Sequence, residues 1–296
     1  MKTPQDRYIK VGNINTRYWA EGSQGSPVVL IHGIGQYIES WLPSFGALAE
    51  KYRVYAVDLL GHGRTDKPLD VSYKIADLAQ FVKDFMATLG IEHAHIVGHS
   101  LGGAIGARLA LVQPSVVDKL VLVDSGGLGK EVTIVIRIMN IPILGEILTR
   151  PSRSAPASFA KLVVHDPAVM TDELIELSYQ MSLLPGVQKS FLRTVRANGN
   201  LFGQSKSMYS PNVQGLPSIT KPVLVVWGRQ DQVIPVAHAE VATKSLPNVR
   251  VQIFDDCGHF PMLEHTQSFN ELLLEFLGNQ VISQKNLVPQ AANANL

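Results

Sequence analysis

The sequence predicts an α/β fold with a mostly parallel, eight-stranded sheet, and three observations carry this prediction. Short apolar runs alternate with stretches of helical periodicity along most of the chain. The runs are continuous, as is typical of strands buried on both faces of a parallel sheet. One run turns into a helix through a serine flanked by glycines, and polar residues follow several others. This order favours right-handed crossovers and helices on both faces of the sheet.

The elements follow in order along the chain. Strands are predicted at residues 8–11, 15–20, 27–31, 52–57, 94–97, 119–123, 222–227 and 249–254. The first two are separated by Gly12-Asn13 and form a hairpin. Helices between the strands are predicted at residues 40–51, 75–89, 101–111, 236–245 and 266–277. The amphipathic face of each helix would cover the sheet.

The alternation of strands and helices is interrupted between residues 126 and 216, where the segments have helical character and no convincing strand. We therefore predict a helical cap at 126–216, inserted after the sixth strand into a core domain formed by 1–125 and 217–283. Residues 284–296 are polar and alanine-rich, which predicts a disordered tail. The apolar block 132–148 is too short and too interrupted for a membrane span, so stable membrane insertion is not expected. We expect it to be a lid helix over a pocket.

Composition excludes several classes of protein. The 296 residues carry a net charge of +1, which favours neither nucleic acid nor an anionic membrane as partner. The single cysteine, Cys257, excludes an internal disulfide and a thiolate metal cluster. No metal site and no cofactor are expected, because no metal-ligand or phosphate-loop motif is present. The polar start of the chain lacks the apolar core of a signal peptide, so a cytoplasmic location is expected. A monomer or a homodimer is expected as well.

The serine turn reads Gly98-His99-Ser100-Leu101-Gly102. A strand that turns sharply into a helix leaves no room for side chains two residues on either side of the tip, and glycine removes that obstacle. Ser100 would then present its hydroxyl at a helix N-terminus, where free N–H groups favour developing negative charge. A G-x-S-x-G turn between a strand and a helix is typical of a nucleophile elbow.

A serine nucleophile needs a base, and the base needs an acid that orients it. His259 follows the last strand and precedes the last helix, which places it on a loop at the sheet edge that carries Ser100. Asp124 and Asp231 both follow strands. Asp231 is the favoured acid, and Asp124 is expected to hold loop backbone. The predicted catalytic residues are therefore Ser100, Asp231 and His259.

The oxyanion of a tetrahedral intermediate needs two N–H donors. Leu101 supplies the first, and the second comes from the loop His32-Gly33-Ile34-Gly35, with Ile34 preferred over Gly35. His32 is expected to brace this loop. An apolar pocket is predicted between the sheet edge and the cap. Its further predicted lining residues are Trp41, His99, Met139, Ile143, Val233 and Phe260.

With these motifs in view, the chain resembles the capped, serine-nucleophile branch of the α/β-hydrolase superfamily over about residues 8–278. The resemblance is carried by the histidine-glycine loop at 32–35, the glycine-rich loop at 58–68, the serine turn at 98–102, the Gly228–Asp231 loop and the loop at 258–261. It implies the α/β-hydrolase fold and hydrolase activity on a small molecule. A serine at the elbow argues against epoxide hydrolases and haloalkane dehalogenases.

The resemblance leaves three functions open. The leading hypothesis is a carboxylesterase acting on a small or medium apolar ester. The second is a C–C hydrolase of meta-cleavage products, which the run at 126–129 resembles. That subfamily usually has tryptophan after the catalytic histidine, where this chain has Phe260, and a cap arginine for the substrate carboxylate, a role open to Arg193 or Arg196. The third is a ligand receptor with slow hydrolysis.

Overall fold

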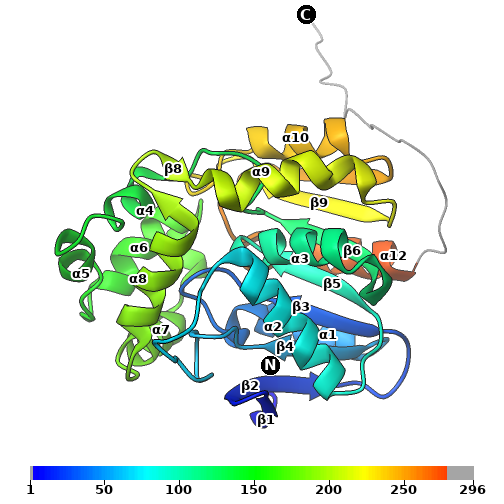
Figure 1. Ribbon diagram of the computed structural model, residues 1–296, viewed down its shortest axis with the longest axis horizontal. Coiled ribbons are helices and arrows are strands. Elements are labelled where there is room, and N and C mark those ends of the chain that lie inside the picture. The colour runs from blue at the N-terminus through cyan, green and yellow to red at the C-terminus, as the bar shows by residue number, and fades with distance from the viewer. Residues whose placement is uncertain (1–2, 279–296) are drawn as a thin grey trace, which may run out of the picture.

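The protein, a computed structural model that describes residues 3–278, is built around one eight-stranded sheet (Figure 1). The strands lie in the order β1-β2-β4-β3-β5-β6-β9-β10. Their bounds are Arg7–Val11 (β1), Ile14–Glu21 (β2), Pro27–Ile31 (β3), Arg53–Val57 (β4), Ala94–His99 (β5), Val117–Val123 (β6), Val223–Gly228 (β9) and Val249–Phe254 (β10). β1 and β2 pair antiparallel, as do β2 and β4, and the other neighbours are parallel. This confirms the predicted fold class; the predicted tail lies outside the described residues.

Helices cover both faces of the sheet (Figure 1). On one face lie α1 (Leu42–Ala49), α11 (Pro261–Glu264) and α12 (Thr266–Gly278), and on the other α2 (Ile75–Thr88), α3 (Leu101–Val112), α9 (Lys206–Gly215) and α10 (Ala237–Ser245). Short 3-10 turns occupy η1 (Ile38–Trp41), η2 (Pro114–Val116), η3 (Pro167–Val169) and η4 (Leu216–Ser218). Every residue of β3, Pro-Val-Val-Leu-Ile, is buried, as a continuous apolar run between two helical layers requires.

The segment after β6 projects beyond the carboxyl ends of the parallel strands, at the left of Figure 1. It contains α4 (Ile134–Ile138), α5 (Leu144–Leu148), α6 (Ala155–Val163), α7 (Asp172–Ser182) and α8 (Val187–Asn198). Two strands of two residues each, β7 (Gly199–Asn200) and β8 (Gly203–Gln204), form a small hairpin that the sequence did not predict. Within the described residues, no helix is long and apolar enough to cross a membrane.

The apolar block 132–148 forms two short helices, which corrects the prediction of one lid helix. Proline cannot donate the backbone hydrogen bond that would continue a helix, and Pro142 separates α4 from α5. The Leu144 N–H donates to the Pro142 carbonyl at 2.8 Å, and Ile143 between them has φ 69° and ψ −50°. These are the angles of the strained form of the γ-turn, which is rare for a β-branched residue.

α9 packs on α3 of the core, although the sequence assigned it to the cap. The Asn212 side chain donates to the Ala104 carbonyl at 3.0 Å and accepts from Arg108 Nε at 2.9 Å. The predicted cap at 126–216 therefore includes one helix that contacts the core.

Candidate active site

Ser100 occupies a strained turn between β5 and α3, with φ 53° and ψ −114°. A Cβ on Gly98 would lie 2.2 Å from the Gly102 carbonyl oxygen, and a Cβ on Gly102 would lie 2.2 Å from the Ile31 carbonyl oxygen. Only glycine fits at either position, as the elbow interpretation requires. Ser100 as a whole residue is 5% exposed, while its Oγ is not among the buried side-chain atoms that lack a hydrogen-bond partner. The surrounding loops cover the tip of the turn.

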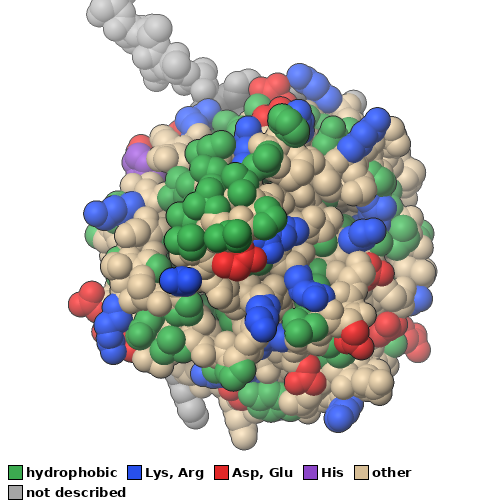
Figure 2. Space-filling view, turned by 60° about the vertical axis from the view of Figure 1, so that its left-hand side comes forward, with side chains coloured by type: hydrophobic (Ala, Val, Ile, Leu, Met, Phe, Trp, Pro, Cys, Tyr) green, Lys and Arg blue, Asp and Glu red, His purple; other side chains and the backbone are tan. Residues whose placement is uncertain are grey.

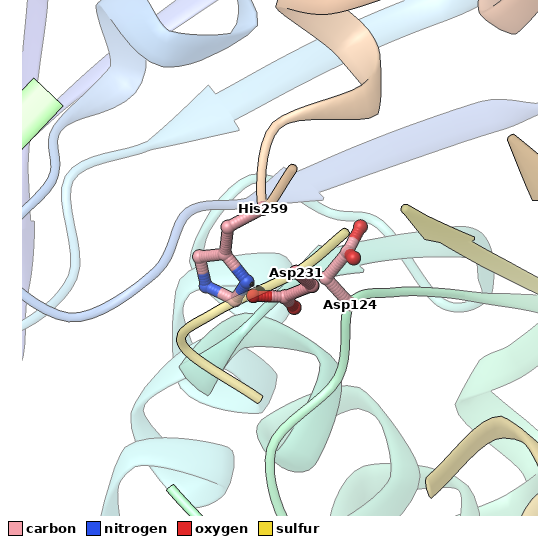
Figure 3. Close-up of side chains that lie close together, drawn as sticks. All are labelled: Asp124, Asp231 and His259. Carbon is pink, nitrogen blue, oxygen red and sulfur yellow. Dashed lines mark hydrogen bonds and ion pairs between the residues drawn. The ribbon is translucent and has the colours of Figure 1, made fainter. Parts of the chain in front are cut away.

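His259 and Asp231 form a buried pair (Figure 3). His259 Nδ1 lies 2.7 Å from Asp231 Oδ2. The other oxygen of Asp231 accepts the N–H groups of Val233 and Ile234 at 2.7 and 3.1 Å. A carboxylate held in this way orients the ring with its proton on Nδ1 and leaves Nε2 as a base.

Asp124 lies beside this pair, in a left-handed backbone conformation with φ 43° (Figure 3). Its Oδ1 accepts the Gly228 N–H at 3.0 Å, so it does hold loop backbone, and its buried Oδ2 has no hydrogen-bond partner in the described structure. Burial and then the nearby charge of Asp231 raise the pKa of Asp124 well above its usual value. The raised pKa favours the protonated form of Asp124 beside the hydrogen-bonded pair.

The same three side chains, Asp124, Asp231 and His259, offer ligand atoms within 4.8 Å of one another, a spacing compatible with a metal ion. The hydrogen bonds point to different chemistry. His259 Nδ1 and both oxygens of Asp231 are already engaged with protein groups. A metal would have to displace the His259–Asp231 hydrogen bond, so the donor set fits an acid–base pair better than a cation site.

The loop that carries His259 lies against both the elbow and the cap. The ring centroid of His259 is 4.7 Å from that of His99, the residue before Ser100. The His259 N–H donates to the carbonyl of Val163 in α6 at 2.7 Å. Ser100 and His259 make no hydrogen bond with each other in the part of the chain described, and hydrogen bonds between nucleophile and base often form only with substrate bound.

Two backbone donors remain available near Ser100. Neither the Ile34 N–H nor the Leu101 N–H has a hydrogen-bond partner within residues 3–278. The loop of Ile34 approaches the elbow closely, because a Cβ on Gly33 would lie 3.0 Å from Ser100 Cβ. His32 braces this loop: its Nδ1 lies 2.7 Å from the Gly33 carbonyl, and its Nε2 accepts the Leu59 N–H at 3.0 Å. Burial lowers the pKa of His32 to about 4, which keeps the ring neutral.

Gln36 is a residue that the sequence did not single out. Its Oε1 accepts the Gly33 N–H at 3.0 Å and lies 3.1 Å from His99 Nδ1. Its Nε2 makes no hydrogen bond among the described residues and lies 2.7 Å from the position of a Cβ on Gly33. The same position is 3.0 Å from Ser100 Cβ, so the amide nitrogen and the serine face one small space. No motif marks Gln36, because only the folded loop brings it there.

His99 links this loop to His259. Its Nε2 lies 2.6 Å from the His259 carbonyl oxygen, and its Nδ1 faces Gln36. Burial, followed by the neighbouring His259, lowers the pKa of His99 well below its usual value. The neutral ring carries one proton and can donate to only one of the two oxygens. His99 therefore positions the surrounding loops and is not arranged as a base.

The predicted pocket residues separate into two groups. Met139 packs with Leu192 and Val195 in a cluster that Ile34 joins, between the cap and the loop at 32–35. Val233 and Phe260 contact the core beside Asp231 and His259. Two pocket predictions do not fit the burial. Trp41 is fully buried in the core between the sheet and α1 and α12, and Ile143 is 75% exposed on the cap.

Comparisons with known proteins identify the family of the chain. Residues 26–266 match the family described as alpha/beta hydrolase fold, and the chain belongs to this family. It is 31% identical to a 2-hydroxymuconate semialdehyde hydrolase of Pseudomonas putida, over 94% of this chain and 97% of the relative. Among solved structures, a meta-cleavage product hydrolase of Pseudomonas fluorescens IP01 matches with TM-score 0.79 and 29% identity over 92% of this chain and 97% of its own. A membrane phospholipase A matches with TM-score 0.81 and 26% identity over 93% and 86%. The chain is thus similar to hydrolases of different substrate classes.

Proposed function

We propose that the protein is a serine hydrolase that cleaves carboxylic esters with small or medium apolar groups, through Ser100, His259 and Asp231. His259 Nε2 takes the proton of the Ser100 hydroxyl as Oγ attacks the ester carbonyl carbon. The carbonyl electron pair moves to oxygen, and the N–H groups of Leu101 and Ile34 bind the oxyanion. Asp231 stabilises the imidazolium that forms on His259.

Collapse of this intermediate releases the alcohol and leaves an acyl group on Ser100. The carbonyl re-forms, the ester C–O bond breaks, and His259 gives its proton to the leaving oxygen. Water then attacks the acyl-enzyme with His259 again as base, which releases the acid and restores the serine. The Gln36 amide, which faces the same space as Ser100, can donate to a substrate oxygen while its Oε1 holds the Gly33 loop in place.

The observation that favours an ester is the direction of the two cap arginines. Arg196 is engaged with Glu146 on the surface at 2.8 Å, and Arg193 donates to the Leu69 carbonyl outside the site. Neither side chain is therefore available for a substrate carboxylate above Ser100. The cap residues that do pack beside Ile34 are apolar: Val135, Ile136, Met139, Phe191, Leu192 and Val195. An apolar wall suits an uncharged acyl or alcohol group.

A C–C hydrolase of meta-cleavage products is the second candidate, because relatives across nearly the whole chain carry names of that activity. A panel of p-nitrophenyl esters from acetate to octanoate, with one dienoate meta-cleavage product, distinguishes the two. We expect sustained turnover of the esters and kcat/KM at least tenfold lower for the dienoate. The reverse ranking assigns the C–C activity. Turnover that stops after one equivalent indicates a receptor and overturns both enzymatic assignments.

A further inference from the structure

The outer face of the cap carries an unusual number of exposed apolar side chains, which Figure 2 shows as one broad hydrophobic patch. The helical hairpin formed by α4 and α5 contributes five of these side chains. Its exposed members are Ile134, Ile143, Leu144, Ile147 and Leu148. The neighbouring turn between β7 and β8 adds Leu201 and the 72% exposed Phe202. We name these seven residues the cap surface. A monomeric protein rarely leaves a contiguous apolar area of this kind without a partner.

The backbone at the tip of this hairpin is strained at Ile143, and the Ile143 side chain points to solvent. Ile143 is 75% exposed and sits at the centre of the γ-turn, where glycine would be tolerated at no steric cost. A β-branched apolar residue there costs stability and gains no burial. Strained non-glycine residues are enriched at functional sites, so the Ile143 side chain is a candidate contact point.

Charge identifies the occupant of the cap surface. Residues 130–161 contain five Lys or Arg and two Glu, so this stretch has a net charge of +3 in a chain whose total is +1. Two of these charges are paired with residues outside the stretch, Glu146 with Arg196 and Arg153 with Glu176. In Figure 2, Lys and Arg side chains border the hydrophobic patch, together with acidic side chains at its lower and upper edges. Exposed apolar side chains with a basic rim match an anionic lipid surface, in which the apolar groups enter the acyl boundary and the cations meet the headgroups.

A second copy of the chain is a weaker match for the cap surface. A two-fold symmetric contact places the same patch on both sides, so the two basic segments would face each other. Their repulsion would oppose the contact. An anionic lipid surface has the complementary charge.

The opposite side of α4 connects the cap surface to the candidate active site. Val135 and Ile136 of α4, with Met139 just after it, pack in the cluster that includes Ile34 of the oxyanion loop. Thus one short helix carries Ile134 of the cap surface on one side and contacts the loop of Ile34 on the other. We propose that the cap surface docks on anionic lipid membranes, next to the site at which apolar esters are cleaved. The docking itself does not depend on the proposed hydrolysis.

Co-sedimentation of the full chain with large vesicles tests this proposal without any readout of activity. We expect binding to vesicles of phosphatidylcholine with phosphatidylglycerol, weaker binding to phosphatidylcholine alone, and release by salt. The double variant Ile143→Ser/Ile147→Ser should lower the partition coefficient roughly tenfold or more, since each isoleucine loses most of its transfer free energy. Arg150→Glu/Arg153→Glu should remove the preference for anionic vesicles.

Val112→Ser is the matched control, because Val112 is 56% exposed at the end of α3 in the core domain. It should bind vesicles like the unmodified protein. Melting temperatures establish that each variant folds. The proposal is overturned by absence of vesicle binding, or by binding that the cap variants leave unchanged. It is also overturned if light scattering shows a dimer that Ile143→Ser/Ile147→Ser dissociates, because the cap surface would then belong to a second copy.

Discussion

Ser100 and Ile143 are two non-glycine residues with positive φ, and they lie in opposite environments. Ser100 is enclosed by the sheet, by its flanking glycines and by the Gly33 loop. Ile143 stands at the tip of a hairpin and touches solvent. Strain of about 1–3 kcal/mol persists at such residues only when the surrounding structure holds them. In the core the packing supplies that constraint, whereas in the cap Pro142 and a few backbone hydrogen bonds of the turn and of α5 supply it. The core should therefore tolerate little change, and the cap should tolerate much.

The largest expected loss of activity follows from a substitution in the core, at Ser100. Ser100→Ala should lower kcat for p-nitrophenyl esters on the order of a million-fold, as removal of the nucleophile does in triad enzymes. The measurement is steady-state hydrolysis, with labelling by a serine-directed phosphonate and peptide mass spectrometry as a second readout. Retention of a tenth of the activity, or a label on another residue, would remove Ser100 from the mechanism.

Substitution of the two neighbouring aspartates should lower kcat to extents that differ by several orders of magnitude. Asp231→Asn should lower kcat roughly ten-thousand-fold, because an amide at this place favours the wrong tautomer of His259. Asp124→Asn should cost much less, since burial and the charge of Asp231 raise the pKa of Asp124 and so favour its neutral form, which an amide resembles. The kcat of each variant is compared at one pH with matched protein. If Asp124→Asn is the more damaging change, the orienting acid is misassigned.

Gln36→Ala should reduce kcat about tenfold, through loss of one hydrogen bond to the Gly33 loop and of an amide donor facing Ser100. KM should change less, because the effect lies in positioning. Gln24→Ala is the control: Gln24 is exposed and donates to the Glu50 carbonyl far along the chain from the elbow. Equal kcat for the two alanine variants would leave Gln36 without a role in the reaction.

In the cap, a change at the inner cluster should alter selectivity more than rate. Met139→Trp adds volume beside Ile34 and should shift the preference toward shorter acyl chains several-fold in kcat/KM; Met139→Ala should shift it toward longer ones. Leu183→Trp, at an exposed position after α7, should leave the profile unchanged. A flat profile for both Met139 variants would mean that the cluster does not border the acyl group.

The smallest effect concerns the strained tip itself. Ile143→Gly removes the steric penalty of the γ-turn and adds freedom to the unfolded chain, so the free energy of unfolding should change by no more than about 1 kcal/mol. Chemical denaturation measures it. If Ile143 were buried or bound to a partner, Ile143→Gly would lower the free energy of unfolding by several kcal/mol. That result would contradict the exposed position of Ile143.

Local sequence rules were sufficient for the sheet, the elbow and the His259–Asp231 pairing. The continuous apolar run Pro27–Ile31 is stable only as a central strand that is buried on both faces. The glycines at 98 and 102 lack side chains that would clash in a sharp strand-to-helix turn. Asp231 and His259 were predicted as partners because parallel strands bring their carboxyl ends to one edge. Their hydrogen bond at 2.7 Å agrees with that interpretation, and their catalytic role remains a prediction.

Tertiary structure alone decided what depends on neighbours distant in sequence. Trp41 and Ile143 are both apolar, but the core encloses Trp41 whereas Ile143 faces solvent. Sequence periodicity does not predict this difference. Gln36 gains its position only when the loop folds over Ser100, and Asp124 its raised pKa only beside Asp231. Backbone sterics are encoded within a few residues, whereas burial, electrostatic coupling and the partner of an apolar face depend on which segments meet in space.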